Sequence, residues 1–376
     1  MTGREAPPVP FVDLPWQHQA IAADITGPML DVMARGAFIQ GPEVKAFEQE
    51  FAAFSGTDFC VGVGNGTDAL ELALRGAGLP AGAEVIVPAN TFVATAEAVV
   101  RAGGVPVIVD CDEYGLIDAA QVASRIGRDT WGVMPVHLYG QMADMETLAE
   151  ICDGRSVQIV EDAAQAQGAE RNGRGIGFWG RAAGTSFYPG KNLGAYGDGG
   201  AVVTQDPDLA AAVRRLANHG SEVKYRHTDV GLNSRLDTLQ AVVLRAKLGR
   251  LHEWNSLRRQ AAASYSERLQ PLEGEGLLRL PPTAAGNLPV WHLYVVRVAQ
   301  RDRVLDHLGS HGIGAGIHYP TPVHLTDAFS HLGYSRGDFP VAEAMADEIL
   351  SLPMYPGITE AIIDRVVAAL TDALRD

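Results

Sequence analysis

Residues 59–110 read FCVGVGNGTDALELALRGAGLPAGAEVIVPANTFVATAEAVVRAGGVPVIVD, and this stretch decides the fold. Short apolar runs alternate in it with amphipathic runs, in the order 59–65, 67–78, 83–89, 92–104 and 105–110. Strand, helix, strand, helix, strand at this spacing is typical of a mainly parallel sheet that helices cover on both faces. The sequence therefore predicts an α/β fold with a doubly wound sheet.

The same alternation continues toward the carboxyl terminus, through residues 131–138, 142–152, 157–164, 184–189 and 199–204. Beyond it, the apolar spacing predicts a long helix from about Asp237, and then strand, helix, strand and helix at 290–298, 301–312, 312–319 and 359–374. We therefore predict a large domain over residues 1–236. Residues 237–376 are expected to form a long linking helix and a smaller carboxyl-terminal α/β domain.

The composition is that of an ordinary globular protein, and 376 residues are enough for about two domains. No apolar leader and no run of about 18 apolar residues is found, so we expect a cytoplasmic protein without membrane contact. The net charge of −15 argues against nonspecific binding to nucleic acid, which needs a basic surface. The three cysteines are far apart and lack the spacing of metal ligands, so we expect reduced core thiols and no metal site.

A candidate anion site lies where the first strand of the quoted stretch runs into a helix. The free N–H groups of a helix that opens at Gly66 and Thr67 would bind a phosphate group. Gly64, Gly66 and Ala69 also fit the dinucleotide pattern, with Glu84 as the acidic residue, but Glu84 opens its strand instead of closing it. We therefore favour a phosphate site over a dinucleotide site. A capping role for Thr67 is compatible with it.

Two further strand ends add a carboxylate and a lysine. Asp162 follows an apolar run, although by itself a cap for the next helix would be the commoner role. Ser186 and Lys191 share one tight turn in SFYPGKNLGAYGDGGAVVT, residues 186–204, where Thr185 and Asn192 break the P-loop pattern. A phosphate site, a carboxylate for a ring nitrogen and a lysine for an aldehyde together indicate pyridoxal phosphate.

Six motifs closely resemble, in chain order, those of the DegT/StrS family of sugar aminotransferases: NGTDAL (65–70), TFVAT (91–95), PVHLYG (135–140), VEDAAQA (160–166), SFYPGKNLGAYGDGGAV (186–202) and GLNSRLDTLQAVVL (231–244). The resemblance covers nearly the whole chain. It implies the aspartate aminotransferase fold (fold type I for pyridoxal phosphate), with a mainly parallel seven-stranded sheet in the large domain. It also implies a homodimer with shared active sites at the subunit interface.

The resemblance implies cofactor-binding roles for named residues. Lys191 resembles the Schiff-base lysine, Asp162 the partner of the pyridinium nitrogen, and Phe92 the aromatic residue that stacks on the ring. The positions that resemble the phosphate donors are Gly66, Thr67 and Ser186, with Asn233 reaching the phosphate from the neighbouring subunit. Gln165 stands at a position beside the cofactor that is often His in the family.

The resemblance also implies a substrate and a reaction. In GIHYPTPVHL, His318, Tyr319 and His324 are expected to border the sugar site, and Lys224 and Tyr225 are expected to reach across the dimer. The family's dehydratases carry histidine in place of the lysine, so Lys191 favours transamination.

The motifs GNGTDAL (64–70) and FYPGKNLGAYGDGG (187–200) are most similar to those of enzymes that aminate C3 of nucleotide-linked 3-keto-6-deoxyhexoses. We therefore expect L-glutamate as the amino donor and dTDP as the nucleotide. The alternatives are amination of a 4-keto nucleotide sugar or a cyclitol ketone, or a non-catalytic regulatory protein that binds pyridoxal phosphate.

Overall fold

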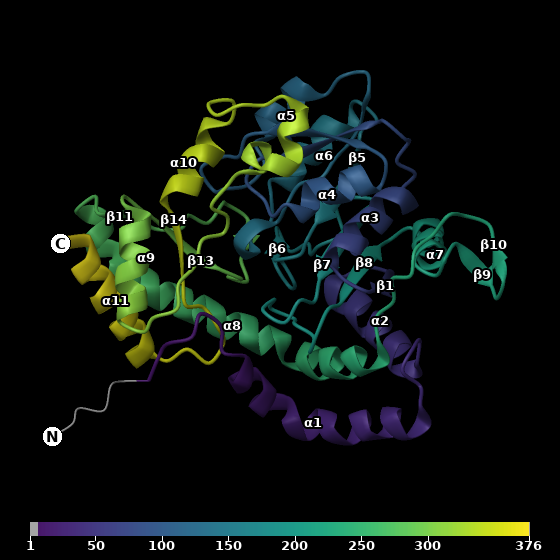
Figure 1. The fold of residues 1–376 in the computed structure, drawn as a ribbon, viewed down its shortest axis with the longest axis horizontal. Helices are drawn as coiled ribbons and strands as arrows, with labels where there is room; N and C mark the ends of the chain where they lie inside the picture. Colours follow the sequence, from purple (N-terminus) through teal and green to yellow (C-terminus); the bar gives the residue numbers. More distant parts are fainter. Residues whose placement is uncertain (1–6, 376) are drawn as a thin grey trace.

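The central element is a seven-stranded sheet in the order β1-β8-β7-β5-β4-β2-β3 (Figure 1). The computed structural model describes residues 7–375. The strands are β1 (Phe59–Val63), β2 (Glu84–Pro88), β3 (Val105–Val109), β4 (Thr130–Val133), β5 (Gln158–Asp162), β7 (Ala182–Ser186) and β8 (Gly200–Thr204). All neighbours pair parallel except β8, which is antiparallel to both β7 and β1. The predicted α/β fold with a mainly parallel sheet is confirmed.

Helices cover the sheet on both faces, as the amphipathic runs predict. The helices of this part of the chain are α1 (Leu14–Arg35), α2 (Pro42–Ser55), α3 (Gly66–Gly76), α4 (Ala94–Arg101), α5 (Ala119–Arg125), α6 (Met145–Asp153) and α7 (Pro207–Leu216). Helix α3 packs on β5, β7 and β8, whereas α2 packs on β1 and the long helix α8. The start of α3 is therefore fixed over the carboxyl ends of the central strands.

Helix α8 (Thr238–Gly274) is the predicted long helix and runs across the lower part of the molecule in Figure 1, above α1. Its first half contributes Ala241, Leu244 and Leu251 to the core of the large sheet. Its second half contributes Tyr265 and Leu269 to a second core under the carboxyl-terminal strands. One helix thus supplies side chains to both of these cores, and its Val242, Val243 and Trp254 form a third, smaller cluster with α1.

The carboxyl-terminal part contains a three-stranded antiparallel sheet in the order β11-β13-β14. Its elements are β11 (Leu278–Arg279), β13 (Tyr294–Val298), α9 (Arg301–Ser310), α10 (Pro340–Glu348), β14 (Ile349–Leu352) and α11 (Glu360–Arg375). The prediction of a strand at 312–319 is wrong, because this stretch makes isolated bridges through Ile313 and Gly316. Glycine at alternate positions leaves one face of such a strand without side chains to pack, and β14 takes the neighbouring place.

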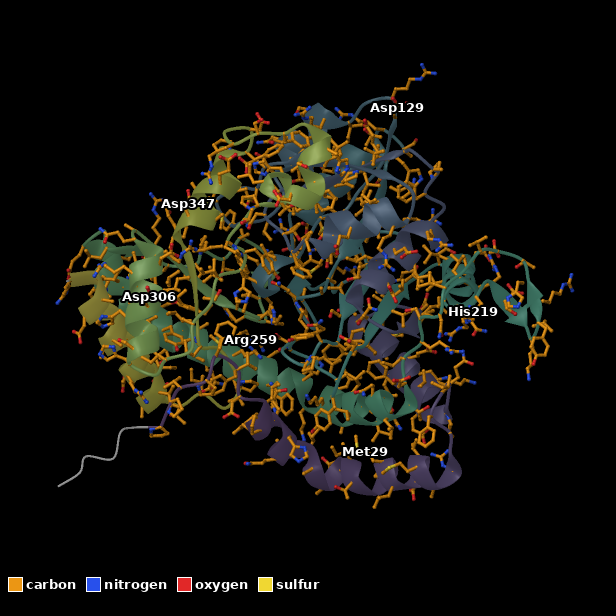
Figure 2. The ribbon with its side chains drawn as sticks, in the orientation of Figure 1. Met29, Asp129, His219, Arg259, Asp306 and Asp347 are labelled. Atoms are coloured by element: carbon orange, nitrogen blue, oxygen red, sulfur yellow. The ribbon has the colours of Figure 1, made fainter. Side chains whose placement is uncertain are left out.

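Short elements complete the chain: β6 (Glu170–Arg171), β9 (Ser221–Val223), β10 (Arg226–His227), β12 (Asn287–Leu288), and the 3-10 turns η1 (Leu138–Gly140), η2 (Val323–Leu325) and η3 (Asp327–Leu332). The hairpin of β9 and β10 projects from the body beyond α7 (Figure 1). Figure 2 places His219 near this hairpin and Asp306, on α9, at the opposite side of the molecule. Within residues 7–375, no helix has the length and apolar character needed to cross a bilayer.

Candidate active site

A cleft of about 870 Å³ opens at the carboxyl ends of the central strands, where the chain start and the carboxyl-terminal part meet the large sheet. Nine of the thirteen residues that sequence analysis singles out line it: Gly66, Thr67, Phe92, Asp162, Gln165, Ser186, Lys191, His318 and Tyr319. They come from segments far apart in the sequence. The parallel topology brings these segments together, since strand ends of this kind meet at one edge of the sheet.

Lys191 lies on the turn after β7, where its backbone N–H donates to the carbonyl of Tyr188 at 2.8 Å. Removal from water lowers the pKa of the Lys191 amine to about 8, and the charge of Asp162 opposes this lowering. Burial disfavours the charged form of a lysine, which is how proteins make an amine reactive near neutral pH. The lowered pKa therefore allows the Lys191 amine to act as a nucleophile or as a base near neutral pH.

Asp162 ends β5 and is buried, with 4% of its surface exposed. Its Oδ2 accepts from the Thr95 hydroxyl at 2.7 Å, and its Oδ1 accepts from the Ala164 N–H at 3.1 Å. Burial raises the pKa of Asp162, while the Thr95 bond, the Ala164 bond and the charge of Lys191 lower it. Turns, and no helix, follow at residues 163–169, so Asp162 does not cap a helix. A buried carboxylate of this kind requires a cationic partner, which a protonated ring nitrogen provides.

The helix start at the other side of the cleft fits a phosphate group. Asn65, and not Thr67, caps α3, because its side chain accepts from the Asp68 N–H at 2.8 Å. Within the described chain, the N–H groups of Gly66 and Thr67 and the Thr67 hydroxyl have no hydrogen-bond partner. A Cβ on Gly66 would lie 2.6 Å from the Ser186 Cβ, so the serine stands directly against the helix start. Unsatisfied donors at a helix amino terminus are the usual elements of a phosphate site.

An aromatic wall completes the cleft. Phe92 keeps 51% of its surface exposed, and its ring centroid lies 5.2 Å from that of Tyr319. Gln165 holds this wall in place, because its Nε2 donates to the Tyr319 hydroxyl at 3.2 Å and its Oε1 accepts from the Tyr139 N–H at 2.7 Å. An exposed phenylalanine inside a cleft offers a flat apolar surface to the face of an aromatic ring.

Four candidate residues lie outside the cleft. Asn233 is exposed and forms an isolated bridge with Asn218, and Lys224 and Tyr225 form the tip of the projecting hairpin, where 84% of Tyr225 is exposed. His324 is buried, and its Nε2 lies 3.1 Å from Oε1 of Glu343. The single chain therefore does not bring these residues to the cofactor site.

The cleft also contains residues that sequence analysis did not single out. Phe11 stacks on His318 with a centroid distance of 5.4 Å, and Arg101 lies at the rim, paired with Asp68 at 3.0 Å and Glu71 at 2.8 Å. His292 lines the cleft just before β13. His292 is a polar residue inside the otherwise mostly apolar run 290–298, and this break in the pattern could have marked it as a candidate site residue.

A protein-family model described as the DegT/DnrJ/EryC1/StrS aminotransferase family matches residues 19–371. A dTDP-3-amino-3,4,6-trideoxy-alpha-D-glucose transaminase of Streptomyces venezuelae is 46% identical over 98% of this chain and 97% of its own length. The erythromycin biosynthesis sensory transduction protein EryC1 of Saccharopolyspora erythraea is 47% identical over 96% of this chain and 98% of its own. The crystal structure of S. venezuelae DesV in complex with a ketimine intermediate has a TM-score of 0.94 at 45% identity, covering 99% of this chain and 100% of that one.

Proposed function

Because the chain belongs to the DegT/DnrJ/EryC1/StrS aminotransferase family, we propose that it moves an amino group from L-glutamate to C3 of a dTDP-linked 3-keto-6-deoxyhexose. Membership makes the chain a pyridoxal-phosphate-dependent aminotransferase, which confirms the predicted family, fold and cofactor. The sugar part is supported by the S. venezuelae transaminase, whose name specifies a dTDP-linked 3-amino sugar. The observation that carries the proposal is the convergence of Lys191, Asp162 and the start of α3 on one cleft.

The donor set of the cleft fits the cofactor. The free N–H groups at the start of α3, together with the hydroxyls of Thr67 and Ser186, would hold the phosphate, and Asp162 would hold the protonated ring nitrogen. Phe92 would cover one face of the ring. When bound, pyridoxal phosphate supplies an electron sink that stabilises negative charge at the reacting carbon.

Lys191 carries the proton transfers in this proposal. With a pKa of about 8, its Nζ is partly unprotonated near neutral pH and takes a proton from the carbon that bears the amino group of glutamate. The same atom returns a proton when the amino group passes to the sugar. Burial raises the pKa of Asp162, and the bonds from Thr95 and the Ala164 N–H oppose that rise. A protonated ring nitrogen would supply the positive charge that favours the carboxylate form.

The charges that line the cleft support a dimer with shared sites. Four carboxylates line the cleft of the described chain, but two cations do, and one of these, Arg101, is already paired with Asp68 and Glu71. A cofactor phosphate and a sugar-linked diphosphate would add several negative charges. We infer that a second copy supplies the missing donors through Asn233 and through Lys224 and Tyr225, which lie on the hairpin that projects from the body (Figure 1).

A panel of nucleotide-linked keto sugars, incubated with glutamate and read by mass spectrometry, tests the reaction. We expect amination of the dTDP-linked 3-keto sugar, and loss of turnover by several orders of magnitude in Lys191→Ala. Amination of a 4-keto sugar or a cyclitol ketone alone, without competition by thymidine diphosphate, would contradict the substrate assignment.

Mixing Lys191→Ala with Asn233→Ala protein that has lost its cofactor on dialysis tests the shared site. Asn233→Ala should lose a charge-assisted hydrogen bond to the phosphate and release cofactor about tenfold to hundredfold more readily. In a mixed dimer with Lys191→Ala, one of the two sites has both an intact lysine and an intact asparagine, so activity should return in part. Mixed dimers without activity would refute the role of Asn233.

The regulatory alternative is not favoured. EryC1 is named as a sensory transduction protein, yet this chain keeps Lys191 and Asp162 together in the cleft, which a binding protein without turnover does not require. Addition of glutamate separates the two functions, because a transaminase must change the visible absorbance of its cofactor. An unchanged spectrum with bound cofactor would favour the regulatory function.

A further inference from the structure

Two threonines form a chain of hydroxyl groups that ends on Asp162. Thr91 lines the cleft in the loop between β2 and α4, and Thr95 lies in the first turn of α4. Both are buried, with 3% and 0% of their surfaces exposed. Oγ1 of Thr91 lies 2.7 Å from Oγ1 of Thr95, which in turn lies 2.7 Å from Oδ2 of Asp162. Both distances are those of well-formed O–H···O hydrogen bonds, so the two hydroxyls connect the wall of the cleft to the carboxylate.

An ionised Asp162 fixes the direction of both hydrogen bonds. A carboxylate only accepts, so the single hydroxyl hydrogen of Thr95 is donated to Oδ2. The Thr95 oxygen then has only lone pairs left, and the hydrogen between the two hydroxyls must come from Thr91. The other carboxylate oxygen, Oδ1, accepts from the Ala164 N–H at 3.1 Å. The donors around Asp162 are therefore arranged for its ionised form.

Thr91 removes an alternative that the Thr95 hydroxyl would otherwise have. A threonine in a helix can turn its hydroxyl toward a backbone carbonyl three or four residues earlier in the chain. Donation from Thr91 occupies one lone pair of the Thr95 oxygen and disfavours this rotation. Hydrogen bonds in series also polarise one another, so the bond from Thr91 strengthens the bond from Thr95 to Asp162.

The other charged and titratable groups near Asp162 act from a greater distance. Lys191 faces it from the turn after β7 and His137 from the segment after β4, and both lower the pKa of Asp162. His137 is itself engaged with Glu161, at 2.9 Å from Nε2 to Oε2, and burial keeps the phenol of Tyr319 neutral. Within residues 7–375, the carboxylate oxygens of Asp162 accept hydrogen bonds from the Thr95 hydroxyl and the Ala164 N–H alone.

We propose that Thr91 is a positioning residue for Asp162, whose hydroxyl donates to Thr95 and thereby directs the Thr95 hydrogen to the carboxylate that faces the cofactor ring nitrogen. The inference rests on the proposed function, in which Asp162 holds the protonated ring nitrogen. The hydrogen bonds lead from Thr91 to Asp162 through Thr95, so the effect of Thr91 must pass through that residue. The more strongly both hydroxyls favour the ionised carboxylate, the more strongly Asp162 favours a protonated ring nitrogen.

The pKa of Asp162 in the cofactor-free protein, read by NMR of labelled aspartate, tests the proposal. Asp162→Asn identifies the resonance of this residue. Thr91→Val keeps the shape of the side chain and removes the hydroxyl, so the pKa of Asp162 should rise by about half a unit. Thr91→Ala should raise this pKa by the same amount, whereas Thr91→Ser keeps the hydroxyl and should keep the wild-type pKa.

A double variant separates a chain of hydroxyls from two independent effects. In Thr91→Val/Thr95→Val, the pKa of Asp162 should equal that in Thr95→Val alone, because Thr91 acts only through Thr95. Thr57→Val is the matched control: its hydroxyl is also buried, but it donates to the carbonyl of Ala52, so the pKa of Asp162 should not change. Additive shifts in the double variant would overturn the proposal. So would a loss of stability in Thr91→Val without any change in the pKa of Asp162, because that result would mean a merely structural role.

Pyridoxal phosphate labelled with nitrogen-15 in its ring provides a second measurement in the loaded protein. The chemical shift of the ring nitrogen should move toward that of an unprotonated ring in Thr91→Val and stay at the wild-type value in Thr91→Ser. The pKa measurement needs neither cofactor nor sugar, so it stands apart from any failure of the proposed function. A raised pKa of Asp162 with an unmoved ring nitrogen would support the link between Thr91 and Asp162 and contradict the proposed role of Asp162 toward the ring.

Discussion

Gly66→Ala adds one methyl group, and we expect it to weaken cofactor binding without preventing the protein from folding. As the first residue of α3, Gly66 has helical backbone geometry that alanine also adopts, and alanine is the better helix former. The added Cβ would nevertheless lie 2.6 Å from the Ser186 Cβ, 3.1 Å from its Oγ and 3.2 Å from its Cα. Carbon atoms in contact stay about 3.5 Å apart, so Ser186 must retreat by about 1 Å.

That displacement involves the backbone at the end of β7 as well as a rotatable tip, because the Cα of Ser186 is among the close atoms. We therefore expect the Ser186 hydroxyl to lose its place at the cofactor phosphate. A hydrogen bond to a charged group contributes about 1.5 to 3 kcal/mol, so Gly66→Ala should weaken pyridoxal phosphate binding about tenfold to hundredfold.

The assay is equilibrium binding of pyridoxal phosphate, followed by its visible band, with urea unfolding of the cofactor-free protein in parallel. Ser186→Ala removes the same hydroxyl without the clash and should reproduce the loss. Gly309→Ala on α9 is the matched control: no atom lies within 4 Å of its added Cβ, so binding should be unchanged and the free energy of unfolding higher by up to about 1 kcal/mol. A folded Gly66→Ala protein that binds cofactor as tightly as wild type would refute this account of the phosphate site.

Three further perturbations address other contacts. Thr95→Val removes the 2.7 Å bond to Asp162, so the pKa of Asp162 in the cofactor-free protein should rise by about one to two units, measured by NMR of labelled aspartate; an unchanged value would contradict the role of Thr95. His324→Gln should lower the free energy of unfolding by about 1 to 3 kcal/mol, because Glu343 loses the imidazole and keeps, among the described residues, only the N–H groups of Gly337 and Phe339 as partners. The KM for the sugar should not change; a raised KM at unchanged stability would instead support a substrate-binding role for His324. Lys247 is buried and has no carboxylate partner among residues 7–375; it donates to the Gly194 carbonyl at 2.7 Å, and burial lowers its pKa from 10.5 to about 8. Between these two pKa values the unfolded chain binds more protons than the folded one, so Lys247 makes the free energy of unfolding rise with pH, by about 3 kcal/mol in total. Urea unfolding from pH 7.5 to pH 10 should therefore show a smaller rise of the free energy of unfolding in Lys247→Met than in wild type. An equal rise in both proteins would exclude the effect.

The large sheet and the phosphate, carboxylate and lysine positions of the cleft followed from local patterns, whereas Phe92, Gln165, His318 and Tyr319 followed from the family resemblance. The alternation from Phe59 to Asp110 predicts the sheet, and parallel topology then requires that Asp162, Ser186 and the start of α3 meet at one edge. These residues converge for topological reasons, so no detail of side-chain packing is needed to bring them together.

The features that sequence analysis did not predict depend on side-chain packing, which local sequence patterns do not encode. Asn65 and Thr67 are both good capping residues, and the register of the helix start decides for Asn65. His324 stands in a polar loop sequence but turns inward toward Glu343, which lies 19 residues further along the chain. His292 gains its place through amides at Asn192 and Asn255, whose contacts join four distant segments. Such contacts depend on the assembled fold.

The sharing of α8 between two cores limits how the gene can be recombined with those of relatives. A crossover placed just before Thr238 would exchange the carboxyl-terminal part together with Ala241, Leu244 and Leu251, which pack under the large sheet of the other parent. A crossover near Trp254 would instead divide the helix between parents and keep Ala241, Leu244 and Leu251 with the large sheet against which they pack. Chimeras joined in the middle of α8 should therefore retain folding more often than chimeras joined at its beginning.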